Sequence, residues 1–388
     1  MSTIRIVSIE CISNVSVVAH LLIEGKQEVI TTEVSDNVCQ YITIDRCDAF
    51  VVGLLFFAMS RGYDIESQIP ISEELFYNLE YHFIDTLAHE GSTLYRTRLN
   101  INTISAIKHT GNIVATGISC GVDSLYTLFL HENMALPSYK ISHVAFYNVG
   151  SHKTGKGQEK DRELYEGRHG LCEAFANEYG YVFYTLTSNI CDIIEKYGGY
   201  SHINNHSYMA AFCILLLQKG MNKYYYSAGH PYTDFRVSKA YKTEELDSSL
   251  YDLLLFYTIS INSLKVYSAG GNIKRIDKTK ALCEYPPAYK YLNVCVRSSK
   301  NDGTCFKCVR TLLSIDAVGN ISDFKDVFDV GLYKRNRKKY IQEMWISAIF
   351  RHDQLYQEIC PYYKKELTLK VKFKALLDKM IAVLKNRI

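Results

Sequence analysis

Short apolar runs alternate with amphipathic segments through the middle of the chain. From residue 112 onward, four runs rich in β-branched and aromatic residues are separated by segments with helical periodicity, which predicts alternating strands and helices. Such an alternation predicts a doubly wound parallel sheet with helices on both faces. The predicted strands are NIVATGI, HVAFYNV, YVFYTLT and KYYYSAG, and the predicted helices are Ser124–His131, Glu159–Tyr179 and Ser207–Lys219.

The two ends of the chain have different patterns. The N-terminal part predicts strands at VVAHLLIEG and QEVITTEVS, a helix at Asp48–Arg61, and a second helix at Ser72–His89 that is capped by Ser72. Residues 284–310, which include Pro286-Pro287, have a loop-like composition, and the pattern after Thr311 is helical, although Leu367–Lys374 alternates like a strand. We therefore expect an α/β domain at 1–108, a central α/β domain at 109–318 with a cysteine loop at 283–310, and a helical basic region at 319–388.

Composition places the chain among ordinary globular proteins. It has 388 residues, of which 47% are hydrophobic and 22% charged, so two or three domains can each bury a core. The net charge is only +3, yet Lys and Arg far outnumber Asp and Glu after residue 330. This basic region predicts either a solvated helical face or a nucleic-acid contact, and both alternatives stay open.

The twelve cysteines are irregularly spaced, unlike a secreted disulfide framework. The N-terminus lacks the basic start and apolar core of a signal peptide. The apolar runs, such as Ala49–Met59, fall short of the roughly 20 residues that a membrane helix needs. We expect a cytoplasmic protein with no membrane partner.

The junction of the first predicted strand and helix carries the sequence Ser119-Cys120-Gly121-Val122-Asp123-Ser124. First-turn amides of a helix have no intrahelical partner and lie at the positive end of its dipole. Gly121 permits close backbone approach, the two serines add hydroxyl donors, and Asp123 can ligate Mg²⁺. These features predict a pyrophosphate cradle. A capped helix start would use the same residue types and remains an alternative.

The same six residues resemble the Ser-Gly-Gly-x-Asp-Ser loop of the PP-loop ATP pyrophosphatases, with Cys120 in place of a glycine. The resemblance implies a Rossmann-like (HUP-type) nucleotide-binding domain. It also implies cleavage of ATP to AMP and pyrophosphate, with adenylation of a carboxylate, urea or tRNA oxygen.

A second glycine-rich stretch follows the next predicted strand, from Gly150 to Gly157. Its glycines and Lys156 have the spacing of a Walker A loop, but Gly157 stands where that loop needs a hydroxyl to ligate Mg²⁺. We expect instead a loop beside the nucleotide that includes Gly150, with Asn148 directed towards adenine or ribose.

Three cysteines, Cys295, Cys305 and Cys308, lie close together in sequence, the last two as a C-x₂-C pair. Closely spaced thiolates predict a tetrahedral zinc site, and a buried or redox-active pair is the alternative. The segment resembles the four-cysteine zinc site of the 7-cyano-7-deazaguanine synthase branch of the PP-loop family, with Asp302 at the position of one cysteine. The resemblance implies Cys295, Asp302, Cys305 and Cys308 as ligands, and Cys283 could replace Asp302.

The resemblance to this branch extends over residues 112–315 and implies a set of site residues. Ser119, Asp123, Ser124 and Lys278 are the expected catalytic residues. The expected cofactors are ATP, Mg²⁺ and structural Zn²⁺. The residues expected to bind ATP are Ser119, Cys120, Gly121, Val122, Asp123, Ser124, Asn148, Gly150, Ser227, Gly229 and Arg275.

The expected function is that of a ligase. ATP would activate a small carboxylate, such as a 7-carboxy-7-deazaguanine-like acid, and ammonia or an amine would then displace AMP. The amine could belong to a partner protein, a homodimer is compatible with the chain, and queuosine-like biosynthesis or antiviral defence is a fitting context. Two alternatives stay open: a tRNA-modifying enzyme whose residues 333–340 grip phosphates, and a non-catalytic nucleotide-binding scaffold.

Overall fold

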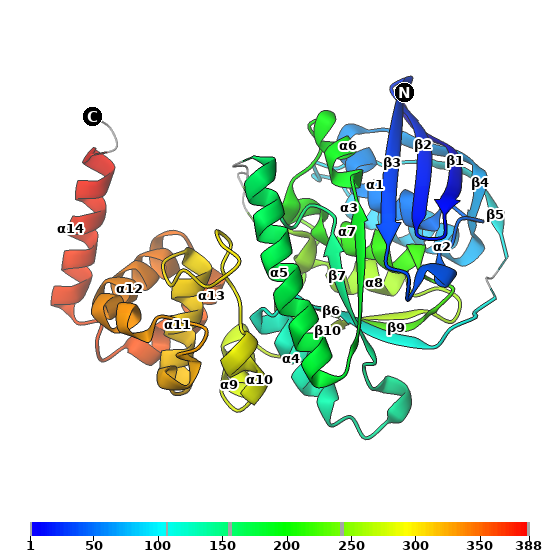
Figure 1. Ribbon diagram of the computed structural model, residues 1–388. Coiled ribbons are helices and arrows are strands. Elements are labelled where there is room, and N and C mark those ends of the chain that lie inside the picture. The colour runs from blue at the N-terminus through cyan, green and yellow to red at the C-terminus, as the bar shows by residue number, and fades with distance from the viewer. Residues whose placement is uncertain (1, 106–107, 154–156, 241–243, 386–388) are drawn as a thin grey trace.

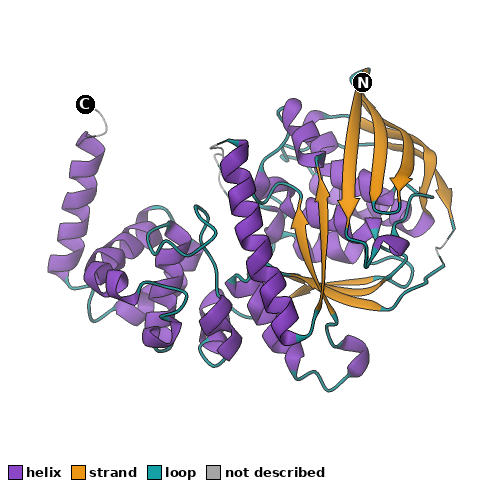
Figure 2. Cartoon of the chain, viewed as in Figure 1, coloured by secondary structure: helices purple, strands orange, loops and turns teal. Residues whose placement is uncertain are grey.

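The computed structural model describes residues 2–105, 108–153, 157–240 and 244–385 (Figure 1). It is a mixed α/β fold built on one ten-stranded, mostly parallel sheet, with helices against both faces and a helical segment beyond α5 (Figures 1 and 2). The strand order is β10-β9-β6-β7-β8-β3-β2-β1-β4-β5. Short 3-10 turns lie at Cys39–Tyr41, Pro137–Tyr139, Tyr232–Asp234, Ser248–Leu250, Ile321–Phe324 and Cys360–Tyr363.

Five parallel strands form a Rossmann-like half-sheet. They are β6 (Ile113–Gly117), β7 (His143–Asn148), β8 (Val182–Ser188), β9 (Met221–Ser227) and β10 (Lys265–Ala269). The chain builds outward from β6 through β7 to β8, then returns to place β9 and β10 on the other side of β6. The strand order reverses between β6 and β9, and ligands usually bind at the carboxyl ends of the strands at such a point.

The four strands predicted for this region are confirmed, whereas β10 was not predicted. The predicted helices are also present, with shifted starts. The intervening helices are α4 (Val122–Glu132), α5 (Gln158–Tyr179), α6 (Ile190–Lys196), α7 (His202–Leu216) and α8 (Asp252–Thr258).

The N-terminal strands continue the same sheet. The strands β1 (Thr3–Ser13), β2 (Ser16–Ile23) and β3 (Lys26–Val34) are antiparallel, and β4 (Asp64–Ser72) and β5 (Leu99–Ile104) pair in parallel beyond β1. β3 joins β8 in antiparallel register, with the Thr32 hydroxyl donating to Ser188 Oγ at 2.9 Å. One continuous sheet therefore includes strands from both sides of the predicted domain boundary at residue 108. The division of the chain into three domains stays a prediction.

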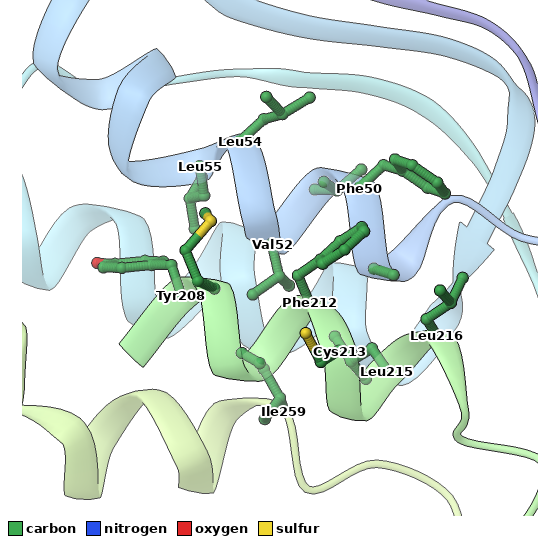
Figure 3. Packing of buried hydrophobic residues seen from close by; sticks show 14 of the residues in the cluster. Phe50, Val52, Leu54, Leu55, Tyr208, Phe212, Cys213, Leu215, Leu216 and Ile259 are labelled. Atoms are coloured by element: carbon green, nitrogen blue, oxygen red, sulfur yellow. The ribbon is translucent and has the colours of Figure 1, made fainter. Parts of the chain in front are cut away.

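The sheet separates two hydrophobic cores. On one face α1 (Asp48–Arg61) packs across α7, and the rings of Phe50 and Phe212 meet edge-on with centroids 5.3 Å apart (Figure 3). A Cβ at Gly53 would lie only 3.2 Å from the Phe212 side chain, so this glycine sets how closely the two helices approach. Alternate β6 residues face opposite cores: Ile113 and Ala115 lie in this one, and Val114 in the other.

Ser72 does not cap the helix that follows it, so that expectation was wrong. Its hydroxyl and its amide both donate to the buried Asp48 carboxylate, which also accepts from Gln218 at 3.0 Å. The cap was misassigned because a buried carboxylate on α1 competes for the same hydroxyl. The predicted Ser72–His89 helix is divided into α2 (Glu73–Asn78), a π-helical turn (Leu79–Phe83) and α3 (Ile84–Leu87).

The C-terminal third is helical. Pro286 and Pro287, expected in a loop, instead begin a short helix, because proline fits the first helical turn without losing a hydrogen bond. The expected strand at Leu367–Lys374 is wrong, because residues 369–374 begin α14, where Lys370 and Lys374 are exposed and the Lys372 ammonium lies 5.8 Å from the Trp345 ring centroid. The helices are α9 (Arg275–Leu282), α10 (Pro286–Tyr291), α11 (Phe306–Val318), α12 (Val330–Phe350), α13 (Gln354–Ile359) and α14 (Leu369–Lys385).

Among the helices in the described ranges, none is both long enough and apolar enough to cross a membrane.

Candidate functional site

The loop between β6 and α4 is organised by two serine hydroxyls. Ser119 Oγ accepts a hydrogen bond from Gly121 N–H at 3.3 Å, and Ser124 Oγ donates to Gly121 C=O at 3.1 Å. The first intrahelical bond runs from Leu125 N–H to Gly121 C=O, so the amides of residues 122–124 have no partner within the helix. The N-cap position is Gly121, which has no side chain, so a side-chain helix cap does not explain this sequence.

Cys120 points away from these amides. Its φ of 54° lies in the left-handed region, and its fully buried Sγ packs 3.9 Å from Cys172 Sγ of α5. Its carbonyl accepts a hydrogen bond from Asn293 N–H at 2.8 Å. The backbone geometry therefore matches what a glycine would adopt there, and the thiol packs in the core beneath the loop and not against the helix N-terminus.

The left-handed backbone at Cys120 predicts unequal tolerance to substitution. We expect Cys120→Gly to leave the melting temperature within about 2 °C, because relief of strain offsets the loss of the buried thiol. Cys120→Val should lower it by about 2–4 °C more than Cys213→Val, since a β-branched residue resists positive φ whereas Cys213 is a buried helical position. Differential scanning calorimetry measures the melting temperature of each variant. Equal decreases for Cys120→Val and Cys213→Val would show that the backbone at Cys120 is not strained.

Asp123, in the first turn of α4, is the centre of an ion-pair cluster. Its Oδ2 lies 3.1 Å from an Arg275 Nη atom, and its Oδ1 lies 3.2 Å from Lys278 Nζ. Lys278, only 1% exposed, also donates to Ala228 C=O at 2.7 Å. Burial alone would raise the pKa of the Asp123 carboxyl, but the charges of Arg275 and Lys278 outweigh burial and lower it. Asp123 is therefore ionised at neutral pH.

Further cations surround this carboxylate. Burial, together with the charges of Arg275 and Arg310, lowers the pKa of Lys307 to about 8. Arg310 is itself buried, and Arg168 of α5 donates to Cys295 C=O at 2.5 Å. Cations thus outnumber Asp123 at the N-terminus of α4, so the site carries a positive potential suited to a polyanion.

The other predicted nucleotide-binding residues divide between two strands. Ser227, at the end of β9, contacts Thr127 Oγ1 of α4 at 2.8 Å, and Gly229 follows the carbonyl that holds Lys278. Asn148 and Gly150 lie at the end of β7, where they contact His152 and Tyr200 and not the Ser119–Ser124 loop. Residues 154–156 of the Walker-like stretch, including Lys156, lie outside the described residues.

The predicted metal ligands come together in space. One side-chain donor atom from each of Cys295, Asp302, Cys305 and Cys308 lies within 4.8 Å of the others. Three sulfurs and one carboxylate oxygen in this arrangement could hold a metal such as zinc. A hydrogen bond from the Cys308 thiol, against the opposing effect of burial, lowers the pKa of Cys305 to about 5, which favours the thiolate that metals bind. Cys283 is not part of the cluster.

The cysteine cluster is directly connected to the loop and its cations. Cys305 is the N-cap of α11 and accepts from Cys308 N–H at 3.4 Å, while Lys307 and Arg310 extend from the same helix. Asn293, which binds the Cys120 carbonyl, lies two residues before Cys295. A ligand that holds the cysteine cluster in place therefore also positions Lys307, Arg310 and one side of the Ser119–Ser124 loop.

A histidine network that we did not predict lies at the end of β9. His206 Nδ1 is 2.8 Å from the Tyr226 hydroxyl, and its Nε2 is 3.1 Å from Asp247 Oδ1. His230 Nε2 lies 3.8 Å from the other Asp247 oxygen. Burial opposes ionisation of Asp247, but both imidazoles hold its pKa well below the usual range. A carboxylate and imidazoles in contact can relay protons at this edge.

Sequence reasoning missed several residues of this site. Lys307 and Arg310 had a usable signal, because they are interleaved with the cysteines in "CFKCVR". Arg168 and Asp247 had none, since each lies far along the chain from the residues it approaches, whereas His230 directly follows the predicted strand KYYYSAG, at a strand end where ligands bind in such sheets. Comparisons with protein-family models, with curated proteins and with solved structures found no match to this chain.

Proposed function

We propose that this chain is an ATP pyrophosphatase of the PP-loop, HUP-type class that adenylates a small carboxylate and passes the acyl group to ammonia or an amine. The observation that carries the proposal is the meeting of free helix amides, Asp123 and buried cations at the carboxyl end of β6. These groups lie where the strand order reverses, the usual nucleotide position in Rossmann-like sheets.

The triphosphate is the part of ATP that the site suits best. The amides of residues 122–124 can donate to phosphate oxygens at the positive end of α4. Arg275 and Lys278, now paired with Asp123, can exchange that carboxylate for phosphate oxygens. Mg²⁺, when bound, would neutralise charge on the leaving pyrophosphate, with Asp123 as its ligand from this chain.

The reaction would proceed in two balanced steps. A substrate carboxylate oxygen attacks the α-phosphorus, the bond to the β-phosphate breaks, and pyrophosphate leaves with the electron pair. An amine nitrogen then attacks the acyl carbon, the bond to AMP breaks, and the amine loses a proton. Ser119 and Ser124 would orient phosphate oxygens, and Lys278 and Lys307 would stabilise the developing negative charge.

Zinc in the cysteine cluster would have a structural role. It would hold the N-terminus of α11, and thereby Lys307, against the loop. The amine donor could be a small molecule or a chain terminus of a partner protein.

The experiment is an assay of AMP and pyrophosphate release from Mg-ATP. Purified protein is incubated with a panel of carboxylic acids that includes 7-carboxy-7-deazaguanine, with and without ammonium. We expect AMP and pyrophosphate in equal amounts, dependent on one acid. AMP release that requires tRNA would favour the tRNA-modifying alternative. ATP binding with no AMP under any condition would favour the non-catalytic scaffold.

A further inference from the structure

A pocket of about 450 Å³ lies between the N-terminal segment and the start of α7. From the N-terminal segment, α1 contributes Phe56, Ser60 and Arg61, and the loop before β5 contributes Thr93 and Leu94. The opposite wall consists of the turn before α7 (Gly198, Gly199, Tyr200 and Ser201) and Asn204 of α7, together with Lys239, Glu245 and Leu246. Its volume is in the range of small-molecule sites, and it forms only because the N-terminal segment packs on α7.

The charges in the pocket favour an anion. Arg61 donates to the carbonyl of Tyr197, and neither Arg61 nor Lys239 forms an ion pair with any carboxylate among the described residues. Glu245 is the one acidic residue in the described lining, and it accepts from Ser201 Oγ at 3.1 Å. Two cations without carboxylate partners in one pocket are typical of a site for an organic anion.

The pocket also offers acceptors to a ligand that carries N–H groups. Asn204 Oδ1 is buried and accepts no hydrogen bond from any described protein group. A buried acceptor that stays unpaired is costly, so a ligand donor would stabilise it. The Glu245 carboxylate is a second acceptor in the lining, and Phe56, Leu94 and Leu246 provide apolar surface for a ring.

Tyr200 connects this pocket to the carboxyl edge of the sheet. It lines the pocket, and its hydroxyl lies 3.5 Å from both the Val149 carbonyl and His202 Nδ1. Gly150, at φ 108°, makes room for that hydroxyl at the end of β7. A ligand in the pocket would thus lie beside the carboxyl end of β7, the strand next to β6, whose carboxyl end leads to Asp123.

We infer that this pocket binds the substrate acid of the proposed reaction, a small ring-bearing carboxylate with N–H donors, and that the N-terminal segment recognises it through Arg61. The claim that the bound acid is then adenylated rests on the proposed function, whereas the claim that the pocket binds the acid does not. It gives residues 1–108 a role: they complete a substrate pocket that the Rossmann-like half-sheet does not form alone.

The test measures acid binding by isothermal titration calorimetry on the full chain. The probes are 2-aminobenzoate, indole-3-carboxylate and 7-carboxy-7-deazaguanine, and indole serves as the probe without a carboxylate. We expect at least one acid to bind with a submillimolar Kd, indole not to bind, and Arg61→Met and Lys239→Met each to weaken the acid about tenfold. Lys338→Met, at an exposed position of α12 in the C-terminal third, is the control.

The outcomes separate this inference from the proposed function. Suppose that Asp123→Asn still binds the acid and that the unmodified protein forms no AMP. The proposed function would then be wrong, whereas the inference that the pocket binds an acid would stand. If Arg61→Met and Lys239→Met both form AMP with an unchanged KM for the acid, the acid does not bind in this pocket. The inference would then be wrong, whereas the proposed function would stand. Failure of all three acids to bind would also overturn the inference. Among the described residues, Lys239 makes no hydrogen bond to the backbone like that of Arg61 to the Tyr197 carbonyl, so its variant separates binding from folding.

Discussion

The Asp123→Asn variant is expected to lose AMP formation by at least about 100-fold while it keeps its fold. Asn removes the charge that would ligate Mg²⁺ and balance Arg275 and Lys278. The fold should survive because the amide oxygen can still accept from Lys278, which also keeps its 2.7 Å bond to the Ala228 carbonyl. AMP release under saturating ATP and a thermal melt measure the two expectations.

The matched control for this experiment is Asp277→Asn. Asp277 is an exposed carboxylate on α9, the helix that carries Arg275 and Lys278, so its variant changes the same charge at a position that faces solvent. Asp277→Asn should keep AMP formation within about twofold. A folded Asp123→Asn protein that still forms AMP would refute the role of Asp123, and equal losses in both variants would point to a disturbed α9.

The sequence predicted the central strands because their apolar runs are continuous and buried on both faces. The one-sided strand β3 was predicted from its own alternation, but β1 and β10 were missed because their patterns are irregular or short. Lys265 and Tyr267 of β10 are exposed, so this edge strand lacks an apolar run. In β1 the alternation of Ile4 and Ile6 is broken by a register shift, after which the buried residue is Ile9, and the period of two is lost.

The start of α7 was placed too late for a physical reason related to the site. His202, Asn204, Asn205 and His206 are polar, and an amphipathic pattern therefore begins only at Ser207, although the helix starts at His202. His206 is polar because it contacts Tyr226 and Asp247 at the strand ends. Residues that serve a site break the periodicity from which helices are predicted.

The grouping of the candidate metal ligands could be predicted, whereas the orientation of Cys120 could not. Cys305 and Cys308 are close in sequence, so their spacing alone brings the sulfurs together. The Cys120 side chain could have entered the space above the helix N-terminus, and only its φ of 54° and its contact with Cys172 exclude this. The approach of Lys307 to Asp123 depends on packing of α11 against α9, which no local pattern encodes.

If the cysteine cluster holds zinc, as we propose, loss of that metal is expected to be the most destabilising single change. Cys305→Ser removes a buried thiolate ligand and leaves Cys295 and Cys308 without a shared ion. Structural zinc contributes about 10 kcal/mol or more to small domains, so we expect the melting temperature to fall by about 10 °C or more. Because α11 carries Lys307 and Asn293 holds the loop, AMP formation should also fall, by at least about tenfold.

The ligand set can be tested through Cys283 and Asp302. Cys283 lies outside the cluster, so Cys283→Ser should keep one zinc per chain by elemental analysis and melt close to the unmodified protein. Asp302→Ala should bind zinc about 10- to 100-fold more weakly, whereas Asp302→Cys should keep it, since a fourth thiolate suits the same tetrahedral site. Cobalt absorption measures the number of thiolate ligands in each variant. If Cys305→Ser retained as much metal as Cys283→Ser, Cys305 would not be a metal ligand. The three cysteines would then be buried thiols, and no metal would connect α11 to the loop.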